Sequence, residues 1–412
     1  MSRSIWVYAN WGDQQEPVLM GNLEVDLVRG AEVYRFAYTS EWLDSPYAIQ
    51  IDPQLHLFSG DQFNNDARNF RVFLDSCPDR WGRLLMQRRE AALARQERRR
   101  VNKLNESDYL LGVHDTYRMG GLRFKLTEDG PFLDNNQQLA APPASSLREL
   151  EYAVSQIEEQ PDLDDPNTLK WLFMLISPGS SLGGARPKAC VTDGDDLWLA
   201  KFPSRYDDHD IGAWEYLVYC MAVDAGVEMA PCRIQRFNSG HHTFLTKRFD
   251  RIKAQRIHFA SAMTQLSYYD GDAGASYLEL AQFLTEHGSN TRSDLEQLWR
   301  RIVFNILVRN SDDHLRNHGF LLANDNSGWR LSPAYDINIS LGANGLHLNI
   351  DEHSNALDLE LALEVSSYFQ LTLDQAKQIA SEVKSVTDKW LNYASQIGIN
   401  RQEQQLLETA LN

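Results

Sequence analysis

The chain has 412 residues and carries 40 Lys and Arg against 57 Asp and Glu, a formal net charge of -17 at pH 7. This acidic balance opposes the broad attraction to phosphate backbones on which unaided nucleic-acid binding depends. The length exceeds that of an ordinary single domain, so we expect two or three packed units.

The four cysteines show no CxxC spacing and are too few for a disulfide framework. We expect them to be buried thiols of a protein in a reducing compartment. The chain begins without an extended apolar run, and no uncharged segment is long enough to cross a bilayer. We therefore expect a soluble, cytoplasmic protein with no membrane partner.

Residues 1–71 alternate apolar and polar side chains over short segments between Gly, Asp and Pro, a pattern typical of β-strands. The segments are SIWVYAN, GNLEVDLV, AEVYRFAYT and YAIQID. We expect a small antiparallel sheet here.

Residues 83–103, RLLMQRREAALARQERRRVNK, have few helix breakers and apolar residues at helical spacing. The basic face of this predicted helix, with Arg98, Arg99 and Arg100, is either a docking face for an acidic partner or for DNA, or simply a solvated surface. We favour the solvated surface. The Pro and Ser residues at 141–146 then indicate a linker or the entry to a helix.

The middle of the chain predicts a hairpin at residues 188–203, followed by a helix that Gly226 ends. A strand is expected at residues 243–251. In the last third, apolar residues at steps of three and four predict a buried helix. They are Leu295, Leu298, Trp299, Ile302, Val303, Ile306 and Leu307. The rest is expected to be mostly helical, with a capping box at Thr372 and Gln375.

The buried helix runs directly into the polar segment VRNSDDHLRNHGF, residues 308–320. Asp312 and Asn317 have the D-x-x-x-x-N spacing of a protein-kinase catalytic loop, in which Asp accepts the substrate proton and Asn holds magnesium. Asp336 follows a short predicted strand, as the metal-binding Asp of a kinase follows its catalytic loop by a hairpin. Oxygen ligands of this kind suit Mg²⁺.

Chemistry on ATP also needs a cation at the phosphates. Lys201 lies in a predicted strand, like the strand lysine of kinases, and Glu215 on the next helix could pair with it. Upstream, Gly183 and Gly184 allow close approach of backbone to phosphate.

Each feature also has an ordinary structural interpretation. A strand Lys is usually on the surface, a Gly pair is usually a turn, and Asp and Asn after a helix usually shape a loop. The segment DDHLRNH and the pairs His241 with His242 and His347 with His353 admit a metal-dependent hydrolase as a less favoured alternative. A catalytically inactive kinase fold that only binds partners is another alternative. The shared chain order of all the features favours a kinase.

The residues resemble those of the HipA-type serine/threonine kinases, the toxins of bacterial type II toxin-antitoxin pairs. The resemblance covers nearly the whole chain. The motifs that carry it are FAYTSEWLDSPYAIQI, FRVFLDSCPDRWGRLLMQR, SSLGGARPKACV, LAKFP, LTKRFDR, NSDDHLRNHGFL and LSPAYDI.

The resemblance implies that Asp312 is the catalytic base, that Asn317 and Asp336 bind Mg²⁺, and that Lys201 holds the phosphates of ATP. The further positions that it implies for nucleotide binding are Ser181, Gly183, Gly184, Lys188, Lys247, Arg248, Phe249, His314 and Tyr335. Of these, residues 247–249 form the hinge beside adenine through backbone groups.

The resemblance also implies autophosphorylation of Ser181, an event that shuts the kinase down. Here the sequence departs from the family pattern, because Ser180 offers a second hydroxyl and ARPK replaces AQEK. A phosphoserine would add nearly two negative charges beside the phosphates of ATP. Ordinary turn hydrogen bonds of the two serines are the alternative.

As partners, the resemblance implies a small helix-turn-helix antitoxin of the HipB type, through which alone the chain would reach DNA. It implies a translation-related substrate such as an aminoacyl-tRNA synthetase, with growth arrest and persistence as the consequence. The predicted fold is α+β, two-lobed and kinase-like. We expect a β-rich subdomain with a helical extension (1–145), an N-lobe with the phosphate loop and Lys201 (146–250), and a helical C-lobe (251–412).

Overall fold

The computed structural model describes residues 2–64, 68–137, 140–159, 166–175 and 186–411. The chain forms two compact units. The first contains residues 1–205, 250–260 and 324–326, and the second contains residues 206–249, 261–323 and 327–412. The sequence-based division at residues 145 and 250 stays a prediction.

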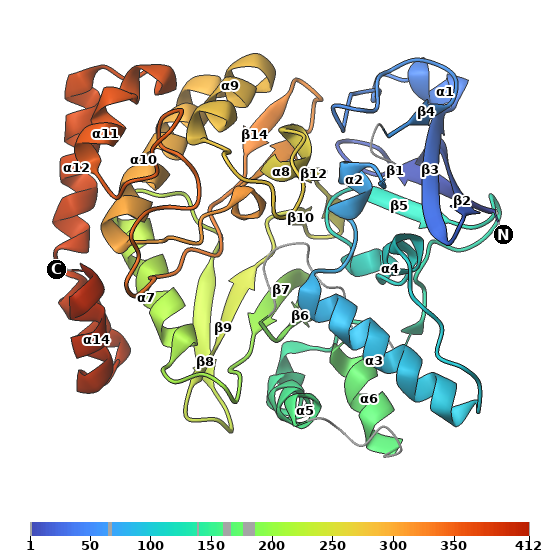
Figure 1. Ribbon diagram of the computed structural model, residues 1–412, viewed down its shortest axis with the longest axis horizontal. Coiled ribbons are helices and arrows are strands. Elements are labelled where there is room, and N and C mark those ends of the chain that lie inside the picture. Colours follow the sequence, from blue (N-terminus) through green and yellow to red (C-terminus); the bar gives the residue numbers. More distant parts are fainter. Residues whose placement is uncertain (1, 65–67, 138–139, 160–165, 176–185, 412) are drawn as a thin grey trace. The chain divides into compact units, whose positions relative to one another are not determined.

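The first unit contains a five-stranded antiparallel sheet in the order β4-β3-β2-β1-β5 (Figure 1). Its strands are β1 (Arg3–Ala9), β2 (Val18–Val28), β3 (Ala31–Tyr38), β4 (Gln62–Phe63) and β5 (Leu122–Lys125). Arg29 and Gly30 both have positive φ, at 51° and 84°, as the tight two-residue turn between β2 and β3 requires. The first three predicted strands are therefore confirmed.

The fourth predicted strand, YAIQID, is wrong. Residues 47–52 form a loop in which Ile51 and Asp52 are buried. The Asp52 carboxylate accepts hydrogen bonds from the backbone N–H groups of Gln54 at 2.9 Å and Val72 at 3.0 Å. Alternation in this segment thus belongs to a buried loop, which the Asp52 carboxylate stabilises by one local hydrogen bond, from Gln54, and one from the distant Val72.

The helices of the first unit are α1 (Ser40–Leu43), α2 (Arg71–Leu74), α3 (Arg80–Gln96), α4 (Glu106–Leu111), α5 (Leu147–Glu158) and α6 (Pro166–Leu175), with 3₁₀ turns at Asp115–Tyr117 and Ala144–Ser146. The predicted helix over residues 83–103 is wrong at its end, because α3 stops at Gln96. Arg98 has a φ of 53°, and the Arg99 guanidinium turns back to Glu90 and Glu97. The positive charge of the segment after α3 is thereby partly neutralised by the carboxylates of Glu90 and Glu97.

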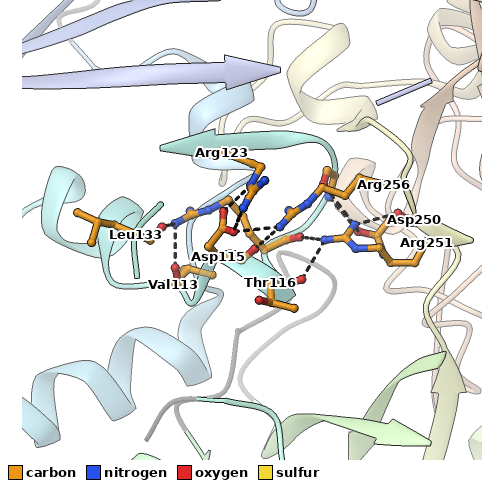
Figure 2. A network of polar contacts seen from close by, with 10 residues as sticks. Val113, Asp115, Thr116, Arg123, Leu133, Asp250, Arg251 and Arg256 are labelled. Atoms are coloured by element: carbon orange, nitrogen blue, oxygen red, sulfur yellow. Dashed lines mark hydrogen bonds and ion pairs between the residues drawn. The ribbon is translucent and has the colours of Figure 1, made fainter. Parts of the chain in front are cut away.

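Arginine side chains fasten residues 250–256 to the rest of the first unit (Figure 2). Arg251 donates to the backbone carbonyls of Arg118 at 2.5 Å and Gly120 at 3.2 Å, and Arg256 donates to the Asp115 carbonyl at 2.6 Å. Arg123 binds the Asp115 carboxylate through two nitrogens. The unit also contains the hairpin of β6 (Lys188–Asp193) and β7 (Asp196–Lys201), which the sequence predicted, and the short pair β10 (Arg251–Ile252) and β11 (Gln255–Arg256).

The second unit contains an antiparallel hairpin of β8 (Cys232–Arg236) and β9 (His242–Lys247) together with helix α7 (Ile211–Asp224). Gly226 has a φ of 77° just beyond α7, so its predicted role in ending this helix is confirmed. The strand predicted over residues 243–251 is too long, because β9 stops at Lys247.

Helix α10 (Thr291–Val308) is the central helix of the second unit, and its predicted apolar stripe is confirmed. Except for the half-buried Leu307, all the predicted stripe residues are buried. Its neighbours in sequence are α8 (Ala262–Gln265), α9 (Tyr277–His287), a 3₁₀ turn at Leu315–Asn317 and the hairpin of β13 (Gly319–Leu322) and β14 (Trp329–Leu331). The short strand β12 (Phe259–Ser261) joins the two units in sequence.

Helices then dominate the C-terminal part (Figure 1): α11 (Leu359–Glu364), a 3₁₀ turn at Ser366–Phe369, α12 (Leu373–Thr387), α13 (Trp390–Ile397) and α14 (Arg401–Leu411). The capping box of Thr372 and Gln375 at the start of α12 is confirmed. Within the described residues, no helix is both long and apolar enough to cross a membrane. None of the four cysteines is in a disulfide; Cys77 and Cys190 are buried as expected, whereas Cys220 and Cys232 are half-buried.

Candidate functional site

The polar segment after α10 forms a tight loop in the second unit. Arg309 ends the helix with a left-handed φ of 54°, and the N–H of Asn310 returns to the Asn305 carbonyl at 2.9 Å. The chain then turns outward, so that Asp312 is exposed while Asn317 is only 3% exposed. A buried helix thus ends in a loop that presents one carboxylate to solvent.

The amide group of Asn317 is held in one orientation. Its Nδ2 donates a 2.9 Å hydrogen bond to the backbone carbonyl of Asp312. The opposite atom, Oδ1, is buried and has no hydrogen-bond partner. Because a buried acceptor without a partner costs free energy, this oxygen is in the state expected of a ligand for a cation or a donor.

Several direct hydrogen bonds join the segment with Asp336 to this loop, and one of them lies next to both candidate ligands. The hydroxyl of Tyr335 donates to the backbone carbonyl of Arg316 at 2.8 Å. Arg316 and Tyr335 immediately precede Asn317 and Asp336, so the bond fixes the two candidate ligands in neighbouring segments. Asp336 itself has a φ of 57°, an uncommon backbone conformation for a residue with a side chain.

These residues fit a magnesium ion chemically. An amide oxygen and a carboxylate are hard oxygen ligands, and Mg²⁺ is typically bound by one or two protein oxygens together with waters and phosphate oxygens. The lone buried Oδ1 of Asn317 supports this assignment.

A metal-dependent hydrolase would need a different ligand set. Among the residues that the structure describes, no group of three or more His, Cys, Asp and Glu side chains could hold a metal ion. The rings of His314 and His347 do approach each other, with centroids 5.8 Å apart. Burial, assisted by the charge of Arg316, lowers the pKa of His314, so the neutral ring is favoured.

Two of the other predicted nucleotide-binding residues contact each other. The rings of Phe249 and Tyr335 have centroids 5.4 Å apart. The backbone N–H of Lys247 is bound to the Pro231 carbonyl at 2.8 Å, and Arg248 is buried. The segment of residues 247–249 therefore reaches, through Phe249, the residue next to Asp336.

In the first unit, Lys201 lies at the end of β7, and its Cα partner across the hairpin is Lys188. Both lysines are buried, at 6% and 2% exposure. The Nζ of Lys188 lies 2.6 Å from the Asp79 carboxylate, so this predicted nucleotide-binding residue is part of a buried ion pair. The remaining predictions, Ser180, Ser181, Gly183 and Gly184, lie outside the described residues.

Sequence reasoning missed the buried polar residues beneath the loop. Asp313 is 2% exposed and accepts hydrogen bonds from the hydroxyl of Tyr277 and, at 2.8 Å, from Nδ2 of Asn305. The Nε2 of His318 lies 2.8 Å from the same carboxylate oxygen. Burial raises the pKa of Asp313, but the charge of His318 and the hydrogen bonds with His318 and Tyr277 outweigh it, so the net pKa is lowered. The sequence signal for this carboxylate was the adjacent pair Asp312 and Asp313, of which only one could face solvent in a tight loop.

Comparison with known proteins identifies the family. The family model described as the HipA-like C-terminal domain matches residues 180–390, more than half of the chain. The chain belongs to the HipA-like family. The predicted family resemblance is thereby confirmed.

Solved structures agree on the fold of this HipA-like chain. The HipA of Shewanella oneidensis, solved in a complex with HipB and its operator DNA, is similar with a TM-score of 0.66 at 18% identity. The match covers 99% of this chain and 95% of the other. At this identity the likeness concerns the fold alone, and it confirms the predicted α+β, kinase-like class.

Two curated relatives match shorter parts of the HipA-like chain. A Haemophilus influenzae protein named "Putative kinase" is 33% identical over 108 residues, 24% of this chain and 31% of its own length. A Sinorhizobium fredii protein named "Putative kinase Y4mE" is 25% identical over 149 residues, 34% of this chain and 33% of its own length. The matched segments thus span about a third of each relative.

Proposed function

We propose that this HipA-like chain is an ATP-dependent serine/threonine protein kinase that acts as the toxin of a toxin-antitoxin pair. The observation that carries the proposal is the Asn317 side chain. Its Nδ2 is held by the Asp312 carbonyl and its buried Oδ1 lacks a partner, at the spacing of a kinase catalytic loop. The family membership and the names of the two relatives support the same activity.

In the proposed reaction the γ-phosphoryl group of ATP passes to a protein hydroxyl, and ADP leaves. The exposed carboxylate of Asp312 orients that hydroxyl and accepts its proton. Asn317 and Asp336 would hold Mg²⁺, which when bound neutralises charge on the phosphate oxygens. Lys201 would hold the phosphates of ATP, and residues 247–249 with Tyr335 and His314 would line the nucleotide site.

Regulation and partners complete the proposal. Ser181, or its neighbour Ser180, would be phosphorylated by the kinase itself, and the added charge would repel nucleotide. A HipB-like helix-turn-helix antitoxin is the proposed partner, since the structurally similar HipA was solved with HipB and operator DNA. An aminoacyl-tRNA synthetase is the proposed substrate.

The proposal is tested by the intact mass of the purified protein before and after incubation with ATP and Mg²⁺. We expect wild type to gain phosphate, Asp312→Asn to gain none, and Ser181→Ala or Ser180→Ala to identify the modified serine. Protein that arrives unphosphorylated, gains nothing and fails to bind ATP with Mg²⁺ would support the inactive kinase fold instead. Phosphodiester turnover with a transition metal would support the hydrolase.

A further inference from the structure

A continuous line of buried amide and carboxylate groups lies beneath the candidate site in the second unit. From Asp313 it continues through Asn305 and Asn310 to the backbone of Asn338. Asp313, Asn305 and Asn310 are between 0% and 2% exposed. Buried polar groups connected in this way are costly unless each is satisfied, and a satisfied network specifies one arrangement.

Each contact along this line is direct. The Nδ2 of Asn305 donates to Asp313 at 2.8 Å, and the Nδ2 of Asn310 donates to Oδ1 of Asn305 at 3.2 Å. The Oδ1 of Asn310 then accepts the backbone N–H of Asn338 at 3.3 Å. Every amide in the line uses its oxygen and its nitrogen toward different neighbours, so no amide can flip without breaking a bond.

The two ends of this line are the two loops of the candidate metal site. Asp313 follows Asp312 and lies four residues before Asn317, while Asn338 lies two residues after Asp336. The Nδ2 of Asn338 also approaches the Asp336 carboxylate at 3.4 Å. The bond from Tyr335 to the Arg316 carbonyl also joins the loops. Ser340 adds two further bonds, since its N–H donates to the Arg309 carbonyl at 3.1 Å and its hydroxyl accepts the N–H of Ser311 at 3.2 Å.

We propose that Asn310 is a positioning residue that sets the separation between the Asn317 and Asp336 metal ligands. Asn310 itself lies in the loop after α10, and its side chain bonds Asn305 of that helix and the Asn338 N–H of the other loop, but neither candidate metal ligand. This inference rests on the proposed function, because it assigns Asn310 a role toward Mg²⁺. Ligand sites for Mg²⁺ tolerate little distortion, so the loss of one tie weakens the site.

The first arm of the test uses no metal. Hydrogen exchange measured by mass spectrometry compares wild type with Asn310→Ala, in which the N–H of Asn338 loses its acceptor. We expect faster exchange in residues 335–340. Unchanged exchange in this segment overturns the inference.

The second arm measures binding of Mn²⁺ by electron paramagnetic resonance in the presence of a non-hydrolysable ATP analogue. We expect Asn310→Ala to raise the Kd of Mn²⁺ about tenfold, which corresponds to about 1.4 kcal/mol. Trp299→Phe is the control, because it removes a buried hydrogen bond from the same helix to the Ala362 carbonyl, away from both loops. A purely structural role predicts that both variants lose stability and that neither changes the Kd.

The two proposals fail in different ways. If wild type binds no Mn²⁺ with the analogue, the proposed function is wrong, whatever the exchange arm shows. If wild type binds it and folded Asn310→Ala binds it equally well, the positioning role alone is wrong. If Asn310→Ala does not fold, Asn310→Ser replaces it in both measurements. The serine hydroxyl is too short to reach both Asn305 and the Asn338 N–H. Unchanged hydrogen exchange or an unchanged Kd for Mn²⁺ in this variant likewise overturns the positioning role.

Discussion

Lys188 and Lys201 lie directly opposite each other in the hairpin of the first unit, and both side chains are buried. Opposed residues of an antiparallel pair project to the same face, where like charges destabilise the hairpin. The Asp79 carboxylate, 2.6 Å from the Nζ of Lys188, offsets one of the two charges. Asp79 also accepts the N–H of Gly82 at the start of α3, so it joins the hairpin to that helix.

We therefore expect Lys188→Met to destabilise the protein strongly. The change removes the cation from a buried ion pair, which costs about 3 to 5 kcal/mol in comparable cases. Unfolding in urea measures the loss. The control is Lys384→Met, which removes an exposed pair with Asp388 and should cost less than about 1 kcal/mol. Equal losses of unfolding free energy in the two variants would show that the buried pair of Lys188 and Asp79 stabilises the protein no more than an exposed pair.

Tyr335 permits a milder test of the tie between the two loops. Tyr335→Phe keeps the ring that packs on Phe249 and removes the hydroxyl that donates to the Arg316 carbonyl. We expect the free energy of unfolding to fall by about 1 kcal/mol and the affinity for ATP with Mg²⁺ to fall several-fold. Tyr268→Phe removes a hydroxyl contact to Glu279 and serves as the control. An unchanged nucleotide affinity in Tyr335→Phe would argue against this tie.

The sequence predicted the regular elements of the second unit well because periodicity reports burial. The apolar stripe of α10 and the glycine beyond α7 each have a local cause. Residues 47–52 show the limit of that reasoning, since their alternation belongs to a loop that Asp52 organises through Val72. A contact of that kind depends on residues distant in sequence.

In the candidate site, too, the sequence predicted local features but not contacts between distant residues. The spacing of Asp312 and Asn317 selected this loop as the candidate catalytic loop, because the D-x-x-x-x-N spacing is a local motif. The sequence could not distinguish Asp312 from its neighbour Asp313, one exposed and the other buried beneath Tyr277. Nor could it show that Lys188 pairs with Asp79, 109 residues away. Both facts arise only when separate elements pack together.

Arg118 is a fully buried member of the arginine network in the first unit. It is 0% exposed and donates hydrogen bonds to four backbone carbonyls. They belong to Ser76, Leu110, Val113 and Leu133. Arg118→Met leaves these buried acceptors without that donor, so we expect a loss of more than about 3 kcal/mol in urea unfolding. The control Arg205→Met, at the surface, should barely change the free energy of unfolding. A comparable loss in the control would contradict a particular stabilising role for the buried Arg118 hydrogen bonds.

The buried ring of His258 should make the stability of the protein depend on pH. Its ring stacks on Trp11 with centroids 4.6 Å apart, and burial lowers its pKa to about 3. The folded protein therefore keeps the ring neutral, while the unfolded chain takes up a proton below its ordinary pKa of 6.5. The stability contribution is fully present above pH 6.5 and is lost as the pH falls toward 3, by about 1.4 kcal/mol per pH unit.

Between pH 7 and pH 5 this group should thus cost wild type about 2 kcal/mol of unfolding free energy. His258→Phe keeps an aromatic ring on Trp11 but cannot titrate, so its loss over the same interval should be smaller by about that amount. The measurement is urea unfolding of both proteins at the two pH values, and groups that titrate in both cancel in the difference. If His258→Phe and wild type lose equal stability, protonation of His258 does not oppose folding, because the buried ring must then accept its proton at the same pH as the unfolded chain.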